Sequence, residues 1–187
     1  MIYQNDVDPS KILAGFYISK IVPKVSIFNP VLAKHLVLTY LSEFNEVLDP
    51  FSGFSGRLLG VCSTGKRYIG SDNNRNAVIE STEIIKFHHL DASIVERDIL
   101  NVVSMKGECL LTCPPYFNKE TYSNEVVYKT CDEWIEFILS RYNCKRYVFV
   151  VDETDWFLEY VKEEIITKSY FNNVTEYVIV IDKGDNR

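Results

Sequence analysis

Three short apolar segments of the chain each lead into an aspartate, and this pattern limits the folds that the sequence can adopt. We expect strands at Glu46–Leu48, Arg67–Gly70 and Ala92–Arg97, and the aspartates that follow them are Asp49, Asp72 and Asp98. Segments with helical spacing of apolar residues lie between these strands. Alternating strands and helices predict a largely parallel sheet with helices on both faces. The carboxyl ends of parallel strands meet at one edge of the sheet, where ligands bind.

The rest of the chain continues this alternation. We expect helices at Pro30–Phe44, Gly56–Cys62, Asn76–His88, Asp132–Arg141 and Glu153–Val161, and further strands at Glu108–Leu111 and Tyr147–Val151. Ile165–Phe171 and Tyr177–Ile181 are predicted to close the sheet as an antiparallel hairpin. The prediction is an α/β fold with a mostly parallel seven-stranded sheet and a C-terminal hairpin. Residues 28–187 are expected to form a single domain, and the less regular residues 1–27 an N-terminal arm or lid.

Composition excludes several classes of protein. The 187 residues are 47% apolar and 25% charged, as in a soluble globular domain. No apolar run approaches the ~18 residues of a membrane helix, and the first residues lack a basic region followed by an apolar core, so we expect a cytoplasmic protein. The five cysteines lack zinc spacing, which predicts no metal site and reduced thiols. The net charge of -6 does not favour unaided DNA binding, although basic side chains can still gather on one face.

The segment after the first strand has the properties of a ligand-binding loop. Gly53 and Gly56 allow the backbone to turn tightly and to approach a ligand closely. Asp72 follows Asp49 by 23 residues, near the ~20-residue offset at which an acidic side chain meets ribose hydroxyls in dinucleotide folds. Asp98 is a candidate acceptor for an adenine amino group. A phosphate would not favour Asp49 beside it, whereas a ligand with a positive sulfonium and a free amino group would. The alternative is a simple turn that ends the strand.

A second constrained segment runs from Thr112 to Phe117, directly after the apolar residues Cys109-Leu110-Leu111. Two consecutive prolines, Pro114 and Pro115, cannot continue a strand or enter a helix interior, so the chain holds a rigid extended shape. Tyr116 follows this rigid corner. A fixed backbone with a flat side chain suits the binding of a planar ring. The alternative is an ordinary loop.

Together these two segments resemble the S-adenosylmethionine-dependent DNA amino-methyltransferases. Asp49-Pro50-Phe51-Ser52-Gly53-Phe54-Ser55 matches the family pattern Asp-Pro-Phe-x-Gly-x-Gly, except that Ser55 stands at the second glycine. Residues 53–60, Gly-Phe-Ser-Gly-Arg-Leu-Leu-Gly, are similar to phage-type enzymes. The resemblance covers Phe28–Lys183 and implies a Rossmann-like class I methyltransferase fold with S-adenosyl-L-methionine as cofactor. The implied cofactor-binding residues are Phe28, Asn29, Pro30, Lys34, Asp49, Pro50, Phe51, Gly53, Gly56, Asp72, Asn73, Asp98 and Ile99.

The resemblance also implies a catalytic motif, Cys113-Pro114-Pro115-Tyr116. In the family, an Asp, Asn or Ser opens this motif. Its side-chain oxygen and the carbonyl of the first proline accept hydrogen bonds from the target amino group, while the aromatic ring stacks on the flipped base. Cys113 departs from the pattern, because a thiol is a poor acceptor. Three interpretations stay open: the backbone carbonyls suffice, a thiolate accepts the bond but is itself methylated, or the activity is lost.

The resemblance leads to a prediction about function. We expect methyl transfer to an exocyclic amino group of a DNA base, with adenine N6 favoured over cytosine N4, as in restriction-modification systems. Phe117 and Tyr122 are expected to border the base pocket and contact nucleic acid, whereas Trp134 has the helical spacing of a core residue. No target-recognition region is visible, so we expect a partner subunit or a separate module to recognise the DNA. The alternatives are a catalytically weak or inactive binding subunit and a methyltransferase for RNA or for protein glutamine.

Overall fold

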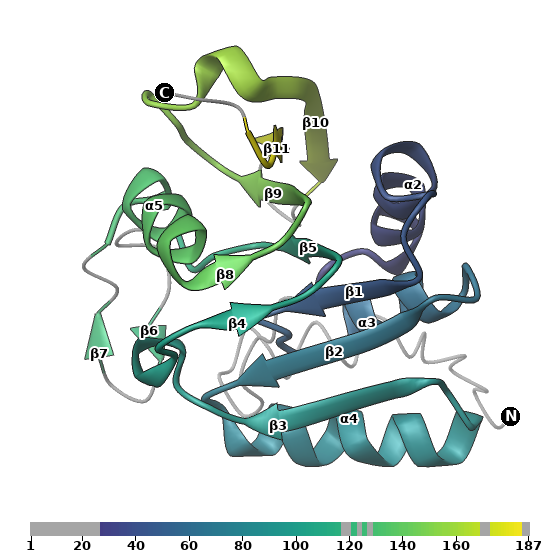
Figure 1. The fold of residues 1–187 in the computed structure, drawn as a ribbon. Coiled ribbons are helices and arrows are strands. Elements are labelled where there is room, and N and C mark those ends of the chain that lie inside the picture. Colours follow the sequence, from purple (N-terminus) through teal and green to yellow (C-terminus); the bar gives the residue numbers. More distant parts are fainter. Residues whose placement is uncertain (1–26, 117–120, 123–124, 127–128, 169–172, 185–187) are drawn as a thin grey trace, which may run out of the picture.

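A seven-stranded sheet with the strand order β10-β11-β9-β5-β1-β2-β3 organises the chain (Figure 1). The computed structural model describes residues 27–116, 121–122, 125–126, 129–168 and 173–184. The sheet consists of β1 (Glu46–Asp49), β2 (Arg67–Asp72), β3 (Ala92–Glu96), β5 (Cys109–Thr112), β9 (Arg146–Val151), β10 (Val161–Lys168) and β11 (Asn173–Asp182). Strand β11 runs antiparallel to β9 and to β10, and the five strands from β9 to β3 are parallel. The predicted sheet and its C-terminal hairpin are confirmed.

The helices and minor strands complete the fold. The helices are α2 (Pro30–Tyr40), α3 (Gly56–Cys62), α4 (Arg75–His88) and α5 (Cys131–Arg141), with the 3-10 helices η1 (Ile99–Asn101) and η2 (Leu158–Tyr160). Two short strand pairs lie outside the main sheet: β4 (Met105–Lys106) with β8 (Tyr142–Asn143), and β6 (Thr121–Tyr122) with β7 (Glu125–Val126). No helix of the described ranges has the length and apolar character that a membrane crossing requires.

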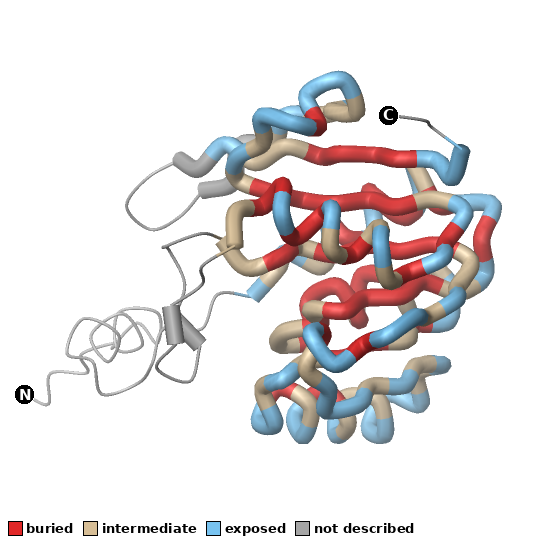
Figure 2. The backbone as a smooth tube through the Cα atoms, turned by 60° about the vertical axis from the view of Figure 1, so that its left-hand side comes forward, coloured by how far each residue is buried: buried red, intermediate tan, exposed pale blue. Residues whose placement is uncertain are grey.

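Two apolar cores cover the two faces of the sheet, so the central strands are buried along their length (Figure 2). Alternate residues of a strand point to opposite faces. In β1, Val47 belongs to the core under α2, α3 and α4, while Leu48 belongs to the core under α5. The buried residues Leu36 of α2 and Leu58 of α3 lie in the first core, and Ile135 of α5 lies in the second. Helices therefore cover both faces, as predicted.

The predicted helix at Glu153–Val161 is wrong. The structure has only the 3-10 helix η2 there, and β10 begins at Val161. The carboxylate of Asp132, at the start of α5, accepts hydrogen bonds from the Thr154 hydroxyl at 2.5 Å and from the backbone N–H groups of Asp155 at 2.8 Å and Trp156 at 3.1 Å. This carboxylate holds residues 154–156 as a turn, and a tertiary contact thus overrides the local helical pattern. Helix α2 is also shorter than predicted, since it ends at Tyr40.

The contact between α2 and α3 depends on Gly60. A Cβ atom at this position would lie 2.4 Å from Cβ of Ala33 and 2.6 Å from the carbonyl oxygen of Pro30. Both neighbours are fixed by α2, so the added methyl group could enter only if the helices moved apart. Helix α3 directly follows the glycine-containing loop after β1. The packing of α3 against α2 therefore helps to position that loop.

We expect Gly60→Ala to destabilise the protein by about 3 kcal/mol, because overpacking of a fixed contact costs about 1–3 kcal/mol. Gly65→Ala is the matched control: Gly65 has a φ of 78° but open space around it, so the cost there is the left-handed backbone alone, about 1 kcal/mol. Urea unfolding of both variants measures the difference. Equal losses for the two variants would show that the α2–α3 contact adapts to a methyl group.

Candidate active site at the carboxyl edge of the sheet

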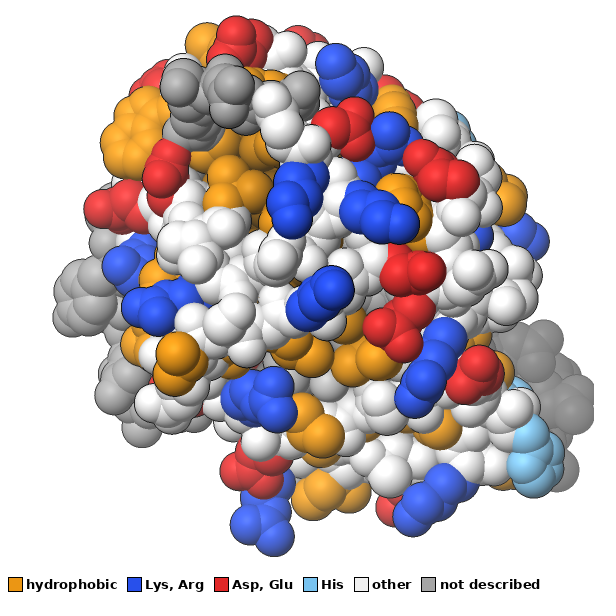
Figure 3. Space-filling view, in the orientation of Figure 1, with side chains coloured by type: hydrophobic (Ala, Val, Ile, Leu, Met, Phe, Trp, Pro, Cys, Tyr) orange, Lys and Arg blue, Asp and Glu red, His pale blue; other side chains and the backbone are white. Residues whose placement is uncertain are grey.

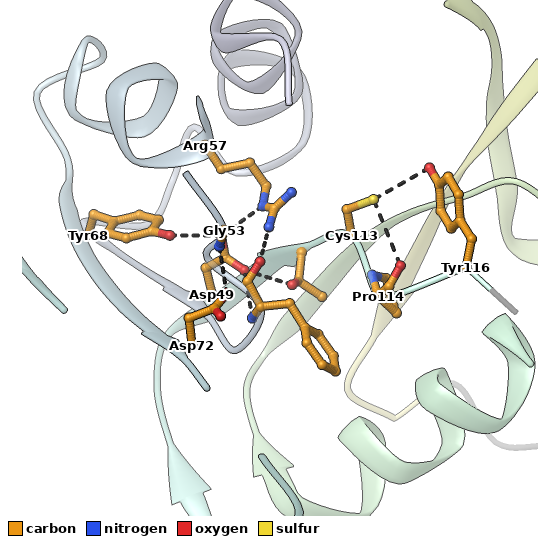
Figure 4. Close-up of polar contacts among 10 residues, drawn as sticks. Asp49, Gly53, Arg57, Tyr68, Asp72, Cys113, Pro114 and Tyr116 are labelled. Atoms are coloured by element: carbon orange, nitrogen blue, oxygen red, sulfur yellow. Dashed lines mark hydrogen bonds and ion pairs between the residues drawn. The ribbon is translucent and has the colours of Figure 1, made fainter. Parts of the chain in front are cut away.

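The two segments singled out in the sequence lie side by side. Strand β1 pairs with β5 on one side, with Leu48 opposite Leu110, and with β2 on the other, with Asp49 opposite Gly70. The loop after β1 and the Cys113–Tyr116 segment after β5 therefore leave the sheet from neighbouring strands at the same edge (Figure 4). This edge is where a parallel α/β sheet binds its ligands.

The carboxylate of Asp49 connects four parts of this edge. One oxygen, Oδ2, accepts hydrogen bonds from Arg57 Nε at 2.7 Å and from the Tyr68 hydroxyl at 2.8 Å. The other, Oδ1, accepts from the Thr112 hydroxyl at 2.7 Å and from the Phe51 N–H at 3.2 Å. The pair is buried, with side-chain exposures of 6% for Arg57 and 0% for Asp49. The site thus contains a desolvated ion pair whose anion has four donors.

The proton equilibria follow from this burial. Burial alone would lower the pKa of Arg57, but the Asp49 carboxylate overrides that effect and raises it above its ordinary value. Burial, reinforced by Asp49, also raises the pKa of the Tyr68 hydroxyl. Arg57 therefore stays cationic and Tyr68 stays a donor to Asp49. The Arg57 guanidinium also donates to the carbonyl oxygen of Phe51, so it supports the loop in two places.

The partner of Asp49 differs from the expectation. The sequence suggested that a positively charged ligand would lie beside this carboxylate, whereas the structure places Arg57 there. Because both oxygens already accept two hydrogen bonds each, a ligand would have to displace one of these donors. Direct contact of Asp49 with a cofactor stays a prediction, and the structure gives the residue a role in holding the loop.

Asp72 lies at the end of β2 and is tied to the loop. Its Oδ2 accepts a hydrogen bond from the Gly53 N–H at 2.8 Å, and its Oδ1 accepts from the Asn74 N–H at 2.8 Å. Burial raises the pKa of Asp72 above its ordinary value, although these two backbone hydrogen bonds act in the opposite direction. Gly53 has a φ of 55°, and a Cβ there would meet only the Phe51 carbonyl oxygen, at 4.0 Å. The loop therefore turns at Gly53, with open space on one side and the half-buried Asp72 carboxylate as the acceptor for its N–H.

The serine that replaces the second family glycine adopts a glycine-like backbone. Ser55 has a φ of 64° and sits at the N-terminus of α3, where its hydroxyl lies 2.7 Å from that of Ser81 on α4. The next residue, Gly56, tolerates no side chain, because its Cβ would fall 2.0 Å from the carbonyl oxygen of Phe28. The loop thus makes a left-handed turn at Ser55, and a buried hydroxyl pair holds it.

The other predicted cofactor residues have varied positions. The side-chain oxygen of Asn29 caps α2 by accepting from the Val31 N–H at 2.9 Å, and Asp98 caps η1 by accepting from the Leu100 N–H at 2.9 Å. Pro30 is the first residue of α2, Ile99 is buried in the core, and both Lys34 and Asn73 are exposed. A cavity of about 120 Å³ lies at the ends of β1, β2 and β3, lined by Asp49, Pro50, Ser71, Val95, Arg97 and Tyr142, among others. This volume accommodates part of a nucleoside-sized ligand.

The Cys113–Tyr116 motif forms a second polar group beside the first. Cys113 Sγ lies 3.4 Å from the Tyr116 hydroxyl, and the Tyr116 hydroxyl donates to a carboxylate oxygen of Glu176 on β11. Burial is the main cause that raises the pKa of Tyr116 far above its ordinary value, with Cys113 and Glu176 adding to it. The tyrosine hydroxyl therefore stays protonated. Figure 4 shows the Tyr116 ring standing next to the Cys113 thiol.

The predicted nucleic-acid contacts are described only in part. Phe117 lies outside the described residues, and for Tyr122 only the backbone, in β6, is described. Trp134 is 8% exposed and packs edge-on against Phe51, with a centroid distance of 5.1 Å, so its predicted core position is confirmed. On the face seen in Figure 3, Lys and Arg side chains lie among Asp and Glu, so the net negative charge does not make this face uniformly acidic.

Four residues of the site were missed in the sequence: Arg57, Tyr68, Thr112 and Glu176. Arg57 carries a detectable signal, because it is the second residue of the helix that follows the loop and is the only cation between Asp49 and Lys66. Thr112 stands directly before the recognised motif. The role of Tyr68 and Glu176 has no local signal, since each depends on which strands become neighbours.

Comparison with known proteins supports the fold. No protein-family model matches the sequence, and no curated protein matches it. Solved structures do match. A modification subunit assigned to a type I restriction enzyme from Vibrio vulnificus has a TM-score of 0.61 at 12% identity, over 92% of this chain and 47% of that one. A protein assigned as an RNA methyltransferase from Pyrococcus horikoshii gives 0.61 at 12% identity, over 82% and 83%. A SAM-dependent methyltransferase from Agrobacterium tumefaciens gives 0.55 at 12%, over 83% and 63%. The chain thus has the Rossmann-like fold of the methyltransferases.

We expect Arg57→Met to destabilise the protein by about 3–5 kcal/mol, because removing one partner leaves the buried Asp49 carboxylate uncompensated. Arg67→Met is the matched control, since the Arg67 side chain is 53% exposed and its ion pairs with Glu46 and Asp91 are long, at 3.7 and 3.8 Å. That change should cost less than about 1 kcal/mol. Chemical denaturation measures both. A loss at Arg57 no larger than that at Arg67 would contradict the role assigned to the buried pair.

Proposed function

We propose that this protein transfers a methyl group from S-adenosyl-L-methionine to an exocyclic amino group of a DNA base, with adenine N6 favoured over cytosine N4. One observation carries the proposal: the hydrogen bond from Thr112 to Asp49, at 2.7 Å, which joins the start of the Cys113-Pro114-Pro115-Tyr116 segment to the loop after β1. A base held by the first segment would therefore lie close to a methyl donor held by the second. The fold match to a restriction-enzyme modification subunit supports DNA as the substrate.

The residues at the loop fit this cofactor. Asp72 presents a carboxylate at the end of β2, where ribose hydroxyls would donate to it, and Gly53 leaves space beside the loop. Phe51 and Pro50 supply apolar contact, and Asp98 lies beyond the end of β3 as an acceptor. Asp49 and Arg57 keep the loop in place from beneath. When bound, the cofactor supplies an electrophilic methyl group on a positive sulfur.

The chain itself has three tasks in the reaction. The rigid Pro114–Pro115 corner and the ring of Tyr116 hold the flipped base, so that its amino nitrogen faces the methyl group. The carbonyl oxygen of Pro114 accepts a hydrogen bond from the amino group, which draws the nitrogen out of conjugation and exposes its lone pair. Cys113 stands at the position of the second acceptor, where the sulfur is weaker than a carboxylate or amide oxygen. We therefore expect a slow enzyme.

The cofactor half is tested by calorimetric titration with S-adenosyl-L-methionine. We expect micromolar binding that Asp72→Ala weakens at least tenfold, because the variant loses the ribose acceptor and frees the Gly53 N–H. Asp91→Ala is the matched control, since this acidic side chain is exposed directly before β3, at the opposite edge of the sheet. Equal affinity in the two variants, or no heat in the unchanged protein, would remove the cofactor from the proposal.

A second candidate function is a non-catalytic subunit that keeps the fold. The observation that favours it is Cys113, a poor acceptor where the reaction requires a good one. Cys113→Asp separates the two candidates: it should raise methyl transfer to unmethylated DNA about tenfold or more if the rest of the site is competent. Cys113→Ala, which has no acceptor, should lower it. Absence of transfer in all three proteins, despite cofactor binding, would support the non-catalytic subunit over the enzyme.

The acceptor is identified in the same assay. Radiolabelled methyl transfer is measured with DNA and with RNA, and the products are hydrolysed to nucleosides and separated. N6-methyladenine from DNA is the expected product. If the product is N4-methylcytosine, the target base is cytosine and not adenine. If only RNA is methylated, the substrate is RNA, as for the structural neighbour that is assigned as an RNA methyltransferase. A partner subunit that recognises the DNA sequence is part of the proposal, and its addition should raise the rate on duplex DNA.

A further inference from the structure

A chain of hydrogen bonds connects Cys113 to a carboxylate on a distant strand. The thiol lies 3.4 Å from the Tyr116 hydroxyl, which in turn contacts Glu176 near the start of β11. Glu176 is 60 residues from Tyr116 in the sequence, and β11 reaches the site because it pairs with β9. The three side chains thus form a line that leads from the position of the expected catalytic acceptor to a negative charge.

The direction of each proton in this line follows from the groups themselves. A carboxylate can only accept, and the Tyr116 hydroxyl has a single proton, which it donates to Glu176 in a charge-assisted hydrogen bond. The hydroxyl therefore turns a lone pair toward Cys113. The thiol donates its proton to that lone pair, at 3.4 Å, since its other acceptor, the carbonyl oxygen of Pro114, lies farther away at 4.0 Å. The raised pKa of Tyr116 keeps this arrangement at neutral and alkaline pH. A thiolate at Cys113 would face the lone pair of Tyr116 and would receive no hydrogen bond from it.

Two other titratable groups of the described chain, Arg57 and Cys131, interact with Cys113, and each already has a partner of its own. Arg57 on α3 interacts electrostatically with Cys113 and would favour a thiolate, but its charge is paired with Asp49 in the buried ion pair. Cys131 on α5 also interacts with Cys113, and its own thiol donates to Asp152 at 3.4 Å. In the described part of the chain, Glu176 forms no ion pair with a Lys, Arg or His. Among the described residues, the negative charge of Glu176 therefore acts on the Tyr116 hydroxyl without a counter-ion beside it.

We propose that Glu176 is a positioning residue that, through the Tyr116 hydroxyl, keeps Cys113 as a neutral thiol and so prevents the sulfur from taking the methyl group intended for the nucleic acid. A thiolate is a strong nucleophile, whereas a thiol is not. A thiolate here would attack the methyl carbon of S-adenosyl-L-methionine, forming a carbon–sulfur bond at Cys113 as the sulfonium bond breaks and S-adenosylhomocysteine leaves. The thiol proton would have to reach solvent first. The protonated sulfur keeps its lone pairs as weak acceptors for the target amino group.

The state of the thiol is tested without the cofactor, by the rate of alkylation with iodoacetamide between pH 6 and pH 10, followed at each cysteine by mass spectrometry. We expect Glu176→Gln to raise the rate at Cys113 about threefold to tenfold at pH 8, because it removes the negative charge. Tyr116→Phe should act in the same direction, since it removes the oxygen that accepts the thiol proton. Glu164→Gln is the matched control, because it removes an exposed carboxylate from the same hairpin and should leave the rate unchanged.

The remaining cysteines report on folding in the same experiment. Cys62 is partly exposed and distant from Glu176, so its rate should stay constant, while the buried Cys109, Cys131 and Cys144 should stay unreacted in every folded variant. Alkylation of these three buried cysteines would show that a variant is unfolded. The test would then depend on the other of the two variants, Glu176→Gln or Tyr116→Phe. Two outcomes would overturn the proposal. In the first, Cys113 of the unchanged protein is alkylated as fast as a thiolate at every pH tested. In the second, both variants fold but neither alters the alkylation rate of Cys113.

The second half of the inference rests on the proposed function and has its own measurement. Incubation with S-adenosyl-L-methionine should add one methyl group to Cys113 in Glu176→Gln at a rate at least threefold above that of the unchanged protein. A second possible result is that a variant that binds the cofactor shows faster alkylation of Cys113 but no S-methylation. That result would support the claim that Glu176 keeps the thiol protonated, and would overturn the claim that it prevents self-methylation. Faster alkylation in a protein that binds no cofactor would instead count against the proposed function.

Discussion

The carboxylate of Asp49 is the group on which the geometry of the carboxyl edge depends. Its four donors come from the loop after β1, from α3, from β2 and from β5, so a single buried anion fixes the relative positions of four elements. A buried ion pair by itself contributes little net stability, because the loss of hydration offsets the attraction between the charges. The contribution of this ion pair is to fix the relative positions of the elements that donate to Asp49. The loop and the Pro-Pro-Tyr segment cannot move independently while Thr112 and Arg57 both hold this carboxylate.

Much of the fold follows from local signals in the sequence. Apolar strands that end in aspartates, separated by helical segments, were sufficient to predict the parallel sheet, and the glycines of residues 53–56 marked the loop. The errors arose where a distant side chain decides the local structure. Residues 154–156 have a helical pattern, yet the Asp132 carboxylate captures their donors and holds a turn. Cys113 was recognised from its motif, whereas Glu176 depends on strand pairing that no local pattern contains.

Ser55 adopts a left-handed backbone at a position where the pattern that the sequence resembles has a glycine. A left-handed backbone at a non-glycine residue costs about 1–2 kcal/mol, so a serine at this point requires compensation. The buried hydroxyl pair with Ser81 supplies a hydrogen bond that a glycine could not make. Solved structures at about 12% identity share the overall fold of this chain. The left-handed turn in this chain is thus formed without a glycine.

The coverage of the sheet is unequal, and this has a thermodynamic consequence. Strand β3 is an edge strand whose residues are mostly exposed, and the described segment after it contains η1 and β4 and no α-helix on the α5 side. Local opening is easiest where few apolar contacts hold the backbone. The amides of β3 should therefore exchange with solvent by small fluctuations, whereas those of the buried β9 require global unfolding. A ligand at the ends of β1, β2 and β3 would order this edge of the sheet, so that occupancy of the site and integrity of the fold are thermodynamically linked.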